Sequence, residues 1–290
     1  MVAESYAELR ELRARRPAAV AEAAARRRRR PLLGEAGRLM IIAADHTARG
    51  ALDVRGITGA MANRYDLLDR LVTALARPGV DGVLATPDVV EDLLLLGALD
   101  DKVVIGSMNR AGLQGARFEI DDRFTAYDSA TIARMGLDGG KMLCRIEPED
   151  PATAPTLEAC AQAVTELAGH GLMAMIEPFL CQRAQGKVVN DLSTAAVVKS
   201  VAIASALGAT SAYTWLKLPV VDAMEQVIAA TTLPTLILGG DPTTATAQIH
   251  DSWAKALALP GVRGLVVGRS LLYPPDGDVA AAVDAAVALL

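Results

Sequence analysis

From residue 38 onward, short apolar and β-branched runs alternate with longer stretches in which apolar residues recur at helical spacing. The runs predicted as strands span residues 39–44, 82–85, 102–106, 141–146, 172–176, 212–218, 235–238 and 264–267. The stretches predicted as helices span residues 59–77, 88–98, 125–137, 155–169, 193–208, 221–230, 243–258 and 277–289. Eight strand-then-helix units within about 250 residues are the usual size of a (β/α)8 barrel, or TIM barrel.

The composition of the predicted strands favours a closed parallel barrel over an open sheet. Each strand is nearly continuous in apolar residues, as expected of parallel strands that are buried on both faces. An open doubly wound sheet would gain support from a GxGxxG segment after the first strand, but Ala43-Ala44-Asp45-His46 stands there. No Pro/Ser-rich linker divides residues 38–290, so we expect one barrel domain over that range.

Residues 1–37 are predicted to form a helical extension in front of the barrel. Leu9, Leu12 and Val20 lie in a stretch rich in Ala, Glu and Arg, and most of that stretch consists of strong helix formers. The run Arg26–Arg30 is either a solvated helix face or terminus, or a basic patch for nucleic acid or targeting. We favour the first interpretation because the rest of the chain lacks nucleic-acid-binding features, and because basic residues at a helix C-terminus suit the helix dipole.

Composition narrows the class of protein. Hydrophobic residues make up 52% of the 290 residues and charged residues 22%, which is typical of a folded globular chain. Aromatic residues make up only 3% and the net charge is −5, so we expect no nucleic-acid partner, although small anions can still bind locally. Cys144, Cys160 and Cys181 lack the paired spacing of a disulfide framework or a zinc module, which fits a reducing compartment.

The sequence also lacks membrane-spanning, secretory and metal-binding patterns, which bears on the location and partners that we expect. No apolar run reaches the ~18 residues of a membrane span, and the N-terminus lacks the pattern of a secretory signal. We therefore expect a cytoplasmic protein that does not associate with membranes, and we also expect a homo-oligomer. No HxH, HExxH or carboxylate cluster indicates a metal site, so no metal and no cofactor is predicted.

A barrel restricts function to the C-terminal ends of its strands and to the loops that follow them. Lys217 stands out there, because it lies between Leu216 and Leu218 inside a predicted strand. A buried ammonium must be paired, or its pKa must fall, and an amine of lowered pKa is a nucleophile for ketones and aldehydes. The alternative is a lysine that extends to solvent or pairs with an acid.

Lys141 is the second lysine predicted in the interior of a strand. If it lies near Lys217, the two cations repel, and each favours the neutral form of the other. The alternative is an ordinary buried ion pair with Asp45 or Glu177. We expect no catalytic role for the remaining lysines. Lys102 is at the start of a predicted strand, Lys187 is in a predicted loop, and Lys199 and Lys255 are on predicted helices.

Two carboxylates and one histidine are also predicted at the mouth of the barrel. Glu177 can carry protons for carbinolamine and imine steps, and Asp45 can do the same or bind a substrate hydroxyl. Each of them can also serve to balance the charge of the lysines. His46 either binds substrate or supports a residue that does.

Glycines and an arginine follow the last two strands of the predicted barrel. TIM barrels often bind a phosphate with the loops after these strands and a short helix N-terminus. Glycines let backbone N–H groups approach the anion, and Arg supplies a forked contact, although glycine pairs also serve as plain turns. The predicted phosphate-binding residues are Gly239, Gly240, Gly268, Arg269 and Ser270.

Five segments of the chain resemble those of a known family, the class I (Schiff-base) aldolases of the DeoC/LacD superfamily, and most of all its tagatose-bisphosphate aldolase branch. The resemblance covers roughly residues 38–275. Its segments are Asp45 with Arg49-Gly50, Lys141 with Pro148, Ile176-Glu177-Pro178, Leu216-Lys217-Leu218-Pro219, and Gly268-Arg269. The departures are two extra residues in the first segment, two fewer in the fourth, and Gly239-Gly240-Asp241 after the seventh predicted strand.

The resemblance implies a metal-independent aldolase that acts on a phosphorylated ketose or keto-sugar acid. It implies that Lys217 forms the imine, that Glu177 shuttles protons with the help of Lys141, and that Arg49 binds substrate. Similar chains in the inositol catabolism of actinobacteria suggest a candidate substrate, 5-dehydro-2-deoxygluconate 6-phosphate, which is cleaved to dihydroxyacetone phosphate and malonate semialdehyde. The alternatives are a sugar-phosphate isomerase or epimerase on the same barrel, and a non-catalytic protein that binds a sugar phosphate.

Overall fold

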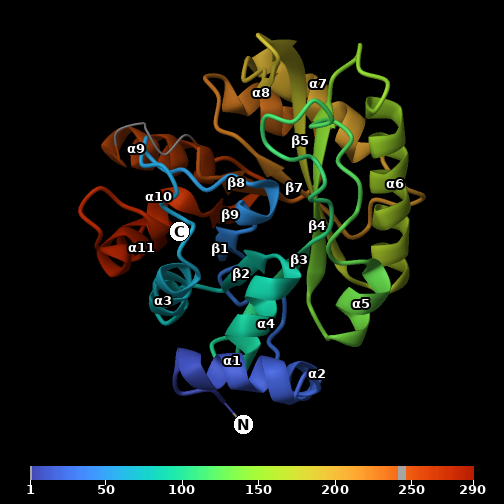
Figure 1. Ribbon diagram of the computed structural model, residues 1–290. Coiled ribbons are helices and arrows are strands. Elements are labelled where there is room, and N and C mark those ends of the chain that lie inside the picture. Colours follow the sequence, from blue (N-terminus) through green and yellow to red (C-terminus); the bar gives the residue numbers. More distant parts are fainter. Residues whose placement is uncertain (1, 241–245) are drawn as a thin grey trace.

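The computed structural model describes residues 2–240 and 246–290, and these form a closed barrel of parallel strands surrounded by helices (Figure 1). Around the barrel the strands are β1 (Leu39–Ala44), β2 (Gly82–Ala85), β3 (Val103–Ser107), β4 (Gly139–Ile146), β5 (Met173–Ala184), β7 (Thr214–Leu218), β8 (Thr235–Leu238) and β9 (Val262–Val267). Pairing of β4 with β5 and of β1 with β9 closes the sheet on itself. The predicted (β/α)8 barrel is confirmed.

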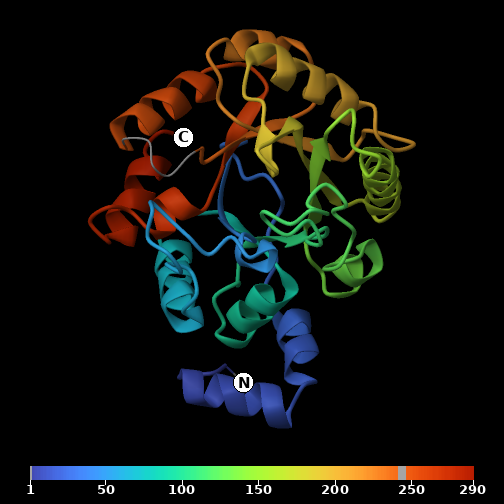
Figure 2. The same cartoon turned by 45° about the horizontal axis from the view of Figure 1, so that its top comes forward.

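Helices lie around the outside of these strands, as Figure 2 shows. In chain order they are α3 (Arg64–Leu75), α4 (Pro87–Leu95), α5 (Ser129–Arg134), α6 (Thr153–Gly169), α7 (Thr194–Ser205), α8 (Met224–Ala229), α9 (Thr246–Leu257), α10 (Arg269–Leu272) and α11 (Val279–Val287). Polar side chains fix several of their starts. The Asn63 side chain accepts hydrogen bonds from the backbone N–H groups of Tyr65 and Asp66, which explains why α3 begins at Arg64 rather than at the predicted residue 59.

Most predicted strand boundaries agree with the structure to within a few residues, but the end of β5 was predicted wrongly. The predicted strand stops at residue 176, whereas β5 continues through Pro178 and pairs antiparallel with β6 (Lys187–Asn190). Gln185 and Gly186 both have positive φ, of 51° and 79°, which is the backbone of a tight two-residue hairpin turn. Lys187 therefore begins a strand and is not in a loop. Asp241 and the predicted start of a helix at residue 243 lie outside the described residues.

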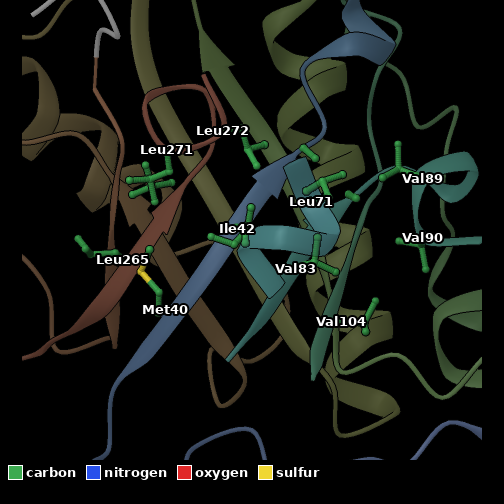
Figure 3. Packing of buried hydrophobic residues seen from close by; sticks show 14 of the residues in the cluster. Met40, Ile42, Leu71, Val83, Val89, Val90, Val104, Leu265, Leu271 and Leu272 are labelled. Atoms are coloured by element: carbon green, nitrogen blue, oxygen red, sulfur yellow. The ribbon is translucent and has the colours of Figure 1, made fainter. Parts of the chain in front are cut away.

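The described apolar side chains pack on both faces of the barrel wall. Met40 and Ile42 point outward to the helices, together with side chains of neighbouring strands (Figure 3). Leu39, Ile41 and Ala43 alternate with them and fill the barrel interior. Both faces of the strands are thus buried, which explains why their sequences are almost continuously apolar.

The N-terminal residues contain helices α1 (Tyr6–Arg15) and α2 (Ala19–Arg26), which lie against one end of the barrel beside α4 (Figure 1). Helix α2 ends at Arg26, so the rest of the arginine run is not a helix face. Arg27 is buried, donates to the backbone carbonyl oxygens of Lys102 and Gly136, and pairs with Asp138.

The other arginines of the run also have acidic partners. Arg29 pairs with Asp138 at 3.0 Å, and Arg30 pairs with Asp81. The expectation of a solvated helix face is therefore wrong for Arg27, because this guanidinium binds polar groups that precede β3 and β4. The division into an extension of residues 1–37 and a barrel domain of residues 38–290 stays a prediction. No helix in the part of the chain that the structure describes is long and apolar enough to cross a membrane.

Candidate active site

A cavity of about 850 Å³ opens where the barrel strands end. Its lining includes every residue that the sequence proposed for the site. These residues are Asp45, His46, Arg49, Lys141, Glu177, Lys217, Gly239, Gly240, Gly268, Arg269 and Ser270. Segments from Asp45 to Ser270 thus meet at one cavity, because the carboxyl ends of parallel strands all lie at the same face of a barrel.

Lys217 is the next-to-last residue of β7, and its side chain is only 5% exposed. Two residues earlier on the same face, Trp215 belongs to the apolar cluster in the barrel interior. Lys217 therefore points up the inside of the barrel into the cavity. Its Nζ lies 2.9 Å from Oε1 of Glu177.

Lys141 is buried on β4 and binds two carboxylates. Its Nζ contacts Oε2 of Glu177 and lies 3.2 Å from Oδ2 of Asp45. Burial, together with the positive charge of Arg110, lowers the pKa of Lys141 to about 8. Lys141 is thus ion-paired, which was one of the alternatives for it. That repulsion from Lys141 favours the neutral form of Lys217 stays a prediction.

The two carboxylates are held in their charged forms. Burial acts to raise the pKa of Glu177, but Lys141 and Lys217 outweigh it and lower that pKa to about 2. Burial likewise opposes ionisation of Asp45, and Arg110 and Lys141 bring its pKa well below the usual range. The Ser107 hydroxyl also donates to Asp45 Oδ2 at 3.0 Å. Both groups are therefore charged at neutral pH.

His46 lies directly after Asp45, at the start of a short turn of 3-10 helix, η1 (Thr47–Arg49). Burial and the nearby charge of Arg269 lower the pKa of His46 to about 3, so the imidazole is neutral at physiological pH. Among the described residues its buried Nδ1 has no hydrogen-bond partner. The ring packs against β9, since a Cβ placed on Gly268 would come 2.9 Å from His46 Cε1.

Two glycines allow the loops after β8 and β9 to approach their neighbours. A side chain on Gly268 would collide with the carbonyl oxygen of Ala43, because a Cβ there would lie only 2.3 Å from it. Gly240 has φ of +71°, a conformation that favours glycine. Arg269 and Ser270 then begin α10 at the cavity wall. The structure brings together the residues predicted to bind phosphate, while phosphate binding itself stays a prediction.

Sequence reasoning missed three further arginines that line the cavity, Arg55, Arg110 and Arg145. Arg145 lies on β4 at even spacing from Lys141, so strand alternation alone places both on one face. Arg110 follows β3 by three residues, and its Nη1 lies 3.1 Å from Asp45 Oδ2. The one signal in the sequence that could have identified Arg110 is its position shortly after a predicted barrel strand.

The hairpin of β5 and β6 also contributes to the cavity. Val188, Val189 and Asn190 of β6 are among its lining residues. Within residues 2–240 and 246–290, no group of three or more His, Cys, Asp or Glu side chains is placed to hold a metal ion. That the reaction needs no metal stays a prediction.

Comparison with known proteins adds a family and a set of similar folds. The family model described as Cgl0159-like matches residues 37–287. The crystal structure of Cgl0159 from Corynebacterium glutamicum is similar over 100% of this chain and 98% of its own, with 58% sequence identity and a TM-score of 0.97. No match was found among curated proteins.

More distant structures share the fold. A Schiff-base-forming fructose-1,6-bisphosphate aldolase has a TM-score of 0.63 at 20% identity, and the match covers 93% of this chain and 99% of that one. An archaeal fructose-1,6-bisphosphate aldolase, solved with its catalytic Lys bound to the carbinolamine intermediate, has a TM-score of 0.63 at 17% identity, over 93% and 98% of the two chains. At this level of identity the likeness shows the fold alone.

Proposed function

This chain belongs to the Cgl0159-like family, and we propose that it is a class I aldolase in which Lys217 forms a Schiff base with a ketone. The observation that carries the proposal is the line of alternating charges inside the barrel. It runs from Lys217 to Glu177, Lys141 and Asp45, and its members are buried or nearly so. The likeness of the barrel to Schiff-base-forming aldolases supports the same reaction class.

The first half of the reaction is imine formation. Lys217 gives a proton to Glu177, whose charged carboxylate lies 2.9 Å away, and the free amine pair attacks the ketone carbon. Glu177 passes this proton to the ketone oxygen, which becomes the hydroxyl of a carbinolamine, and the nitrogen then gives a second proton to Glu177. Glu177 transfers that second proton to the hydroxyl, which leaves as water while the nitrogen lone pair forms the C=N bond of the protonated imine.

The second half is cleavage. The substrate hydroxyl on the second carbon from the imine carbon gives its proton to a carboxylate. Asp45 can accept this proton, because it lies beside Lys141 on the side away from Glu177. The O–H electrons form the aldehyde C=O, and the electrons of the C–C bond flow to the imine nitrogen to give an enamine. Protonation of the enamine and addition of water then release the ketone product and restore Lys217. Lys141 stabilises both carboxylates throughout.

We assign the phosphate of the substrate to the two segments that follow β8 and β9. Arg269 supplies a forked cation, and Gly239 and Gly240 let the backbone come close to the anion. Binding there would hold the ketone at Lys217 and reduce the entropy cost of attack.

For the substrate itself, the sequence resemblance supports a phosphorylated ketose or keto-sugar acid. The candidates are a tagatose-bisphosphate-like ketose of the DeoC/LacD branch and 5-dehydro-2-deoxygluconate 6-phosphate of inositol catabolism. The charge of the cavity supports an anionic substrate, because the described basic side chains that line it outnumber the acidic ones.

Reductive trapping tests the proposal. The enzyme is incubated with dihydroxyacetone phosphate and borohydride, and its intact mass and peptide map are compared with those of the untreated chain. We expect one covalent adduct on Lys217, no adduct in Lys217→Met, and an unchanged adduct in the matched control Lys199→Met, which alters an exposed lysine of α7. Turnover of a sugar phosphate without an adduct would indicate an isomerase or epimerase, and binding without either would indicate a non-catalytic protein.

A further inference from the structure

A second, smaller cavity lies between helices α9, α10 and α11, and we call it the side cavity (Figure 1). Its volume is about 330 Å³, which is enough to hold a small organic molecule. Most of its wall is apolar. That wall includes Ile249 and Trp253 of α9, Leu271 of α10, Pro274 and Pro275 after α10, and Ala282 of α11.

The side cavity adjoins the main cavity at the start of α10. Among the described residues, four line both cavities, and they are Arg55, Ile249, Trp253 and Ser270. Ser270 directly follows Arg269, the residue proposed to bind the substrate phosphate. A molecule bound in the side cavity would therefore contact the same short helix that begins with Arg269.

Arg55 is the cation that the two cavities share, and its backbone is held in an unusual conformation. Val54 and Ile57 exchange two backbone hydrogen bonds, of 3.2 and 2.9 Å, around Arg55 and Gly56. Both central residues have positive φ, of 53° and 75°, as in a type I′ turn. Asn, Asp or Gly usually fills the first central position, because other side chains are strained there. An arginine at this position indicates a function for its side chain rather than for the turn.

The Arg55 guanidinium has hydrogen-bond donors to spare. Its Nε donates to the backbone carbonyl oxygen of Tyr273 at 3.2 Å, which fixes the half-buried side chain against the segment after α10. Among the described residues Arg55 forms no ion pair. Only one acidic residue, Asp276, is found among those that line the side cavity, and it is exposed and accepts from the backbone N–H of Asp278. The charge of Arg55 is therefore available to an anionic ligand.

The wall of the side cavity is already in place without a ligand. Arg70 Nη1 donates to the carbonyl oxygen of Leu272 at 2.9 Å, and its guanidinium lies 4.5 Å from the centre of the Tyr273 ring. On α9 the rings of His250 and Trp253 lie 5.4 Å apart. A preformed wall reduces the ordering cost of binding.

We propose that the side cavity is an inhibitory effector site for a small carboxylic acid with an apolar body, such as an aromatic acid. The apolar body packs between α9 and α11, and the carboxylate binds Arg55. The inhibitory effect rests on the proposed phosphate site at Arg269. An anion held at Arg55 repels a phosphate beside α10, and by linkage a bound phosphate weakens binding of the acid by the same factor.

Calorimetric titration with 2-naphthoate and with its neutral analogue 2-naphthamide tests the site. The two probes share one ring system and differ in charge. We expect 2-naphthoate to bind the wild type roughly 10-fold more tightly, the usual worth of a charge-assisted hydrogen bond. Arg55→Gln should reduce this difference to about twofold or less. The matched control Arg123→Gln, which alters a side chain that is 77% exposed and outside both cavities, should keep it.

A variant that fills the side cavity locates the probes. Ala282→Leu enlarges a lining side chain and should weaken binding of both probes roughly 10-fold or more. The matched control Ala288→Leu makes the same change at an exposed position after α11, outside both cavities, and should bind as the wild type does. Undiminished binding of 2-naphthoate to Ala282→Leu would place the probe in the main cavity and overturn the inference.

Inorganic phosphate tests the coupling between the cavities without any turnover. A saturating concentration should weaken binding of 2-naphthoate to the wild type roughly fivefold, whereas potassium chloride at the same ionic strength should not. An unchanged affinity would overturn the inhibitory role, and equal affinity for 2-naphthoate and 2-naphthamide would overturn the carboxylate site. These wild-type results decide both points even if the variants do not fold. Failure of the dihydroxyacetone phosphate trapping at Lys217 would instead count against the aldolase proposal alone.

Discussion

Lys141 and Lys217 bind the two oxygens of one carboxylate. Lys141 Nζ contacts Oε2 of Glu177, and Lys217 Nζ lies 2.9 Å from Oε1. The sequence suggested direct repulsion between the two lysines, but the structure places a shared anion between them. A proton that leaves Lys217 therefore has an acceptor already in hydrogen-bond contact, and a second cation holds that acceptor in place.

Replacement of Lys217 by Met should abolish aldol cleavage while the fold is kept. The variant loses the only amine on β7, and Met approximates the length of the apolar part of lysine. We expect turnover to fall to background in a coupled assay for dihydroxyacetone phosphate, with an unchanged far-ultraviolet circular dichroism spectrum. Wild-type turnover in Lys217→Met would refute the Schiff-base mechanism.

Glu177→Gln should lower kcat by roughly 10²–10⁴-fold, the usual contribution of a positioned acid–base group. The amide cannot accept the proton of Lys217, yet it keeps the shape of the side chain. Slow trapping by borohydride should persist, because water can replace the proton relay. Full activity of this variant would assign the relay to Asp45 or to water.

The pH dependence should report on Lys141. Because its pKa is lowered to about 8, its ammonium is present below about pH 8 and is lost as the pH rises through that value. We expect kcat/KM to fall on the alkaline side of pH 8, since the cation that stabilises Glu177 and Asp45 disappears there. Lys141→Met should be slow at every pH and should lack this alkaline fall. An identical alkaline limb in Lys141→Met would show that another group causes it.

Arg269→Ala should act mainly on substrate binding. A phosphate contact is present in both the ground state and the transition state, so its loss raises KM by roughly 10- to 100-fold with little effect on kcat. Steady-state kinetics over a wide range of substrate concentration can separate the two parameters. A loss confined to kcat would argue against Arg269 as the phosphate ligand.

Chelation should leave the activity unchanged. In the proposed mechanism the protonated imine withdraws the electrons of the breaking bond, so no Lewis acid is required. Activity after dialysis against EDTA should equal that of the untreated enzyme within error. Loss of activity that zinc or manganese restores would contradict the proposal.

The sequence predicted the site residues that lie in or next to apolar strands, but it did not predict those in longer loops. Lys217 was identifiable because a charged residue within an apolar strand is costly and therefore conspicuous, and Glu177 was identifiable because it directly follows a predicted strand. Arg110 was not, because it lies in a loop where charged residues are ordinary, and only the closed barrel places it next to Asp45. The β5–β6 hairpin was missed because the strand was predicted to stop at residue 176, before Glu177 and Pro178, whereas β5 continues past both in register with β4.

Arg27 makes its contacts across a long stretch of chain, and this has a consequence for folding during synthesis. Its partner Asp138 is 111 residues further along the sequence. At about 5–20 residues per second, roughly 5–20 seconds separate the translation of the two residues. The contact between Arg27 and Asp138 can therefore form only when about half of the chain has been translated, although α2 already has α4 to pack against.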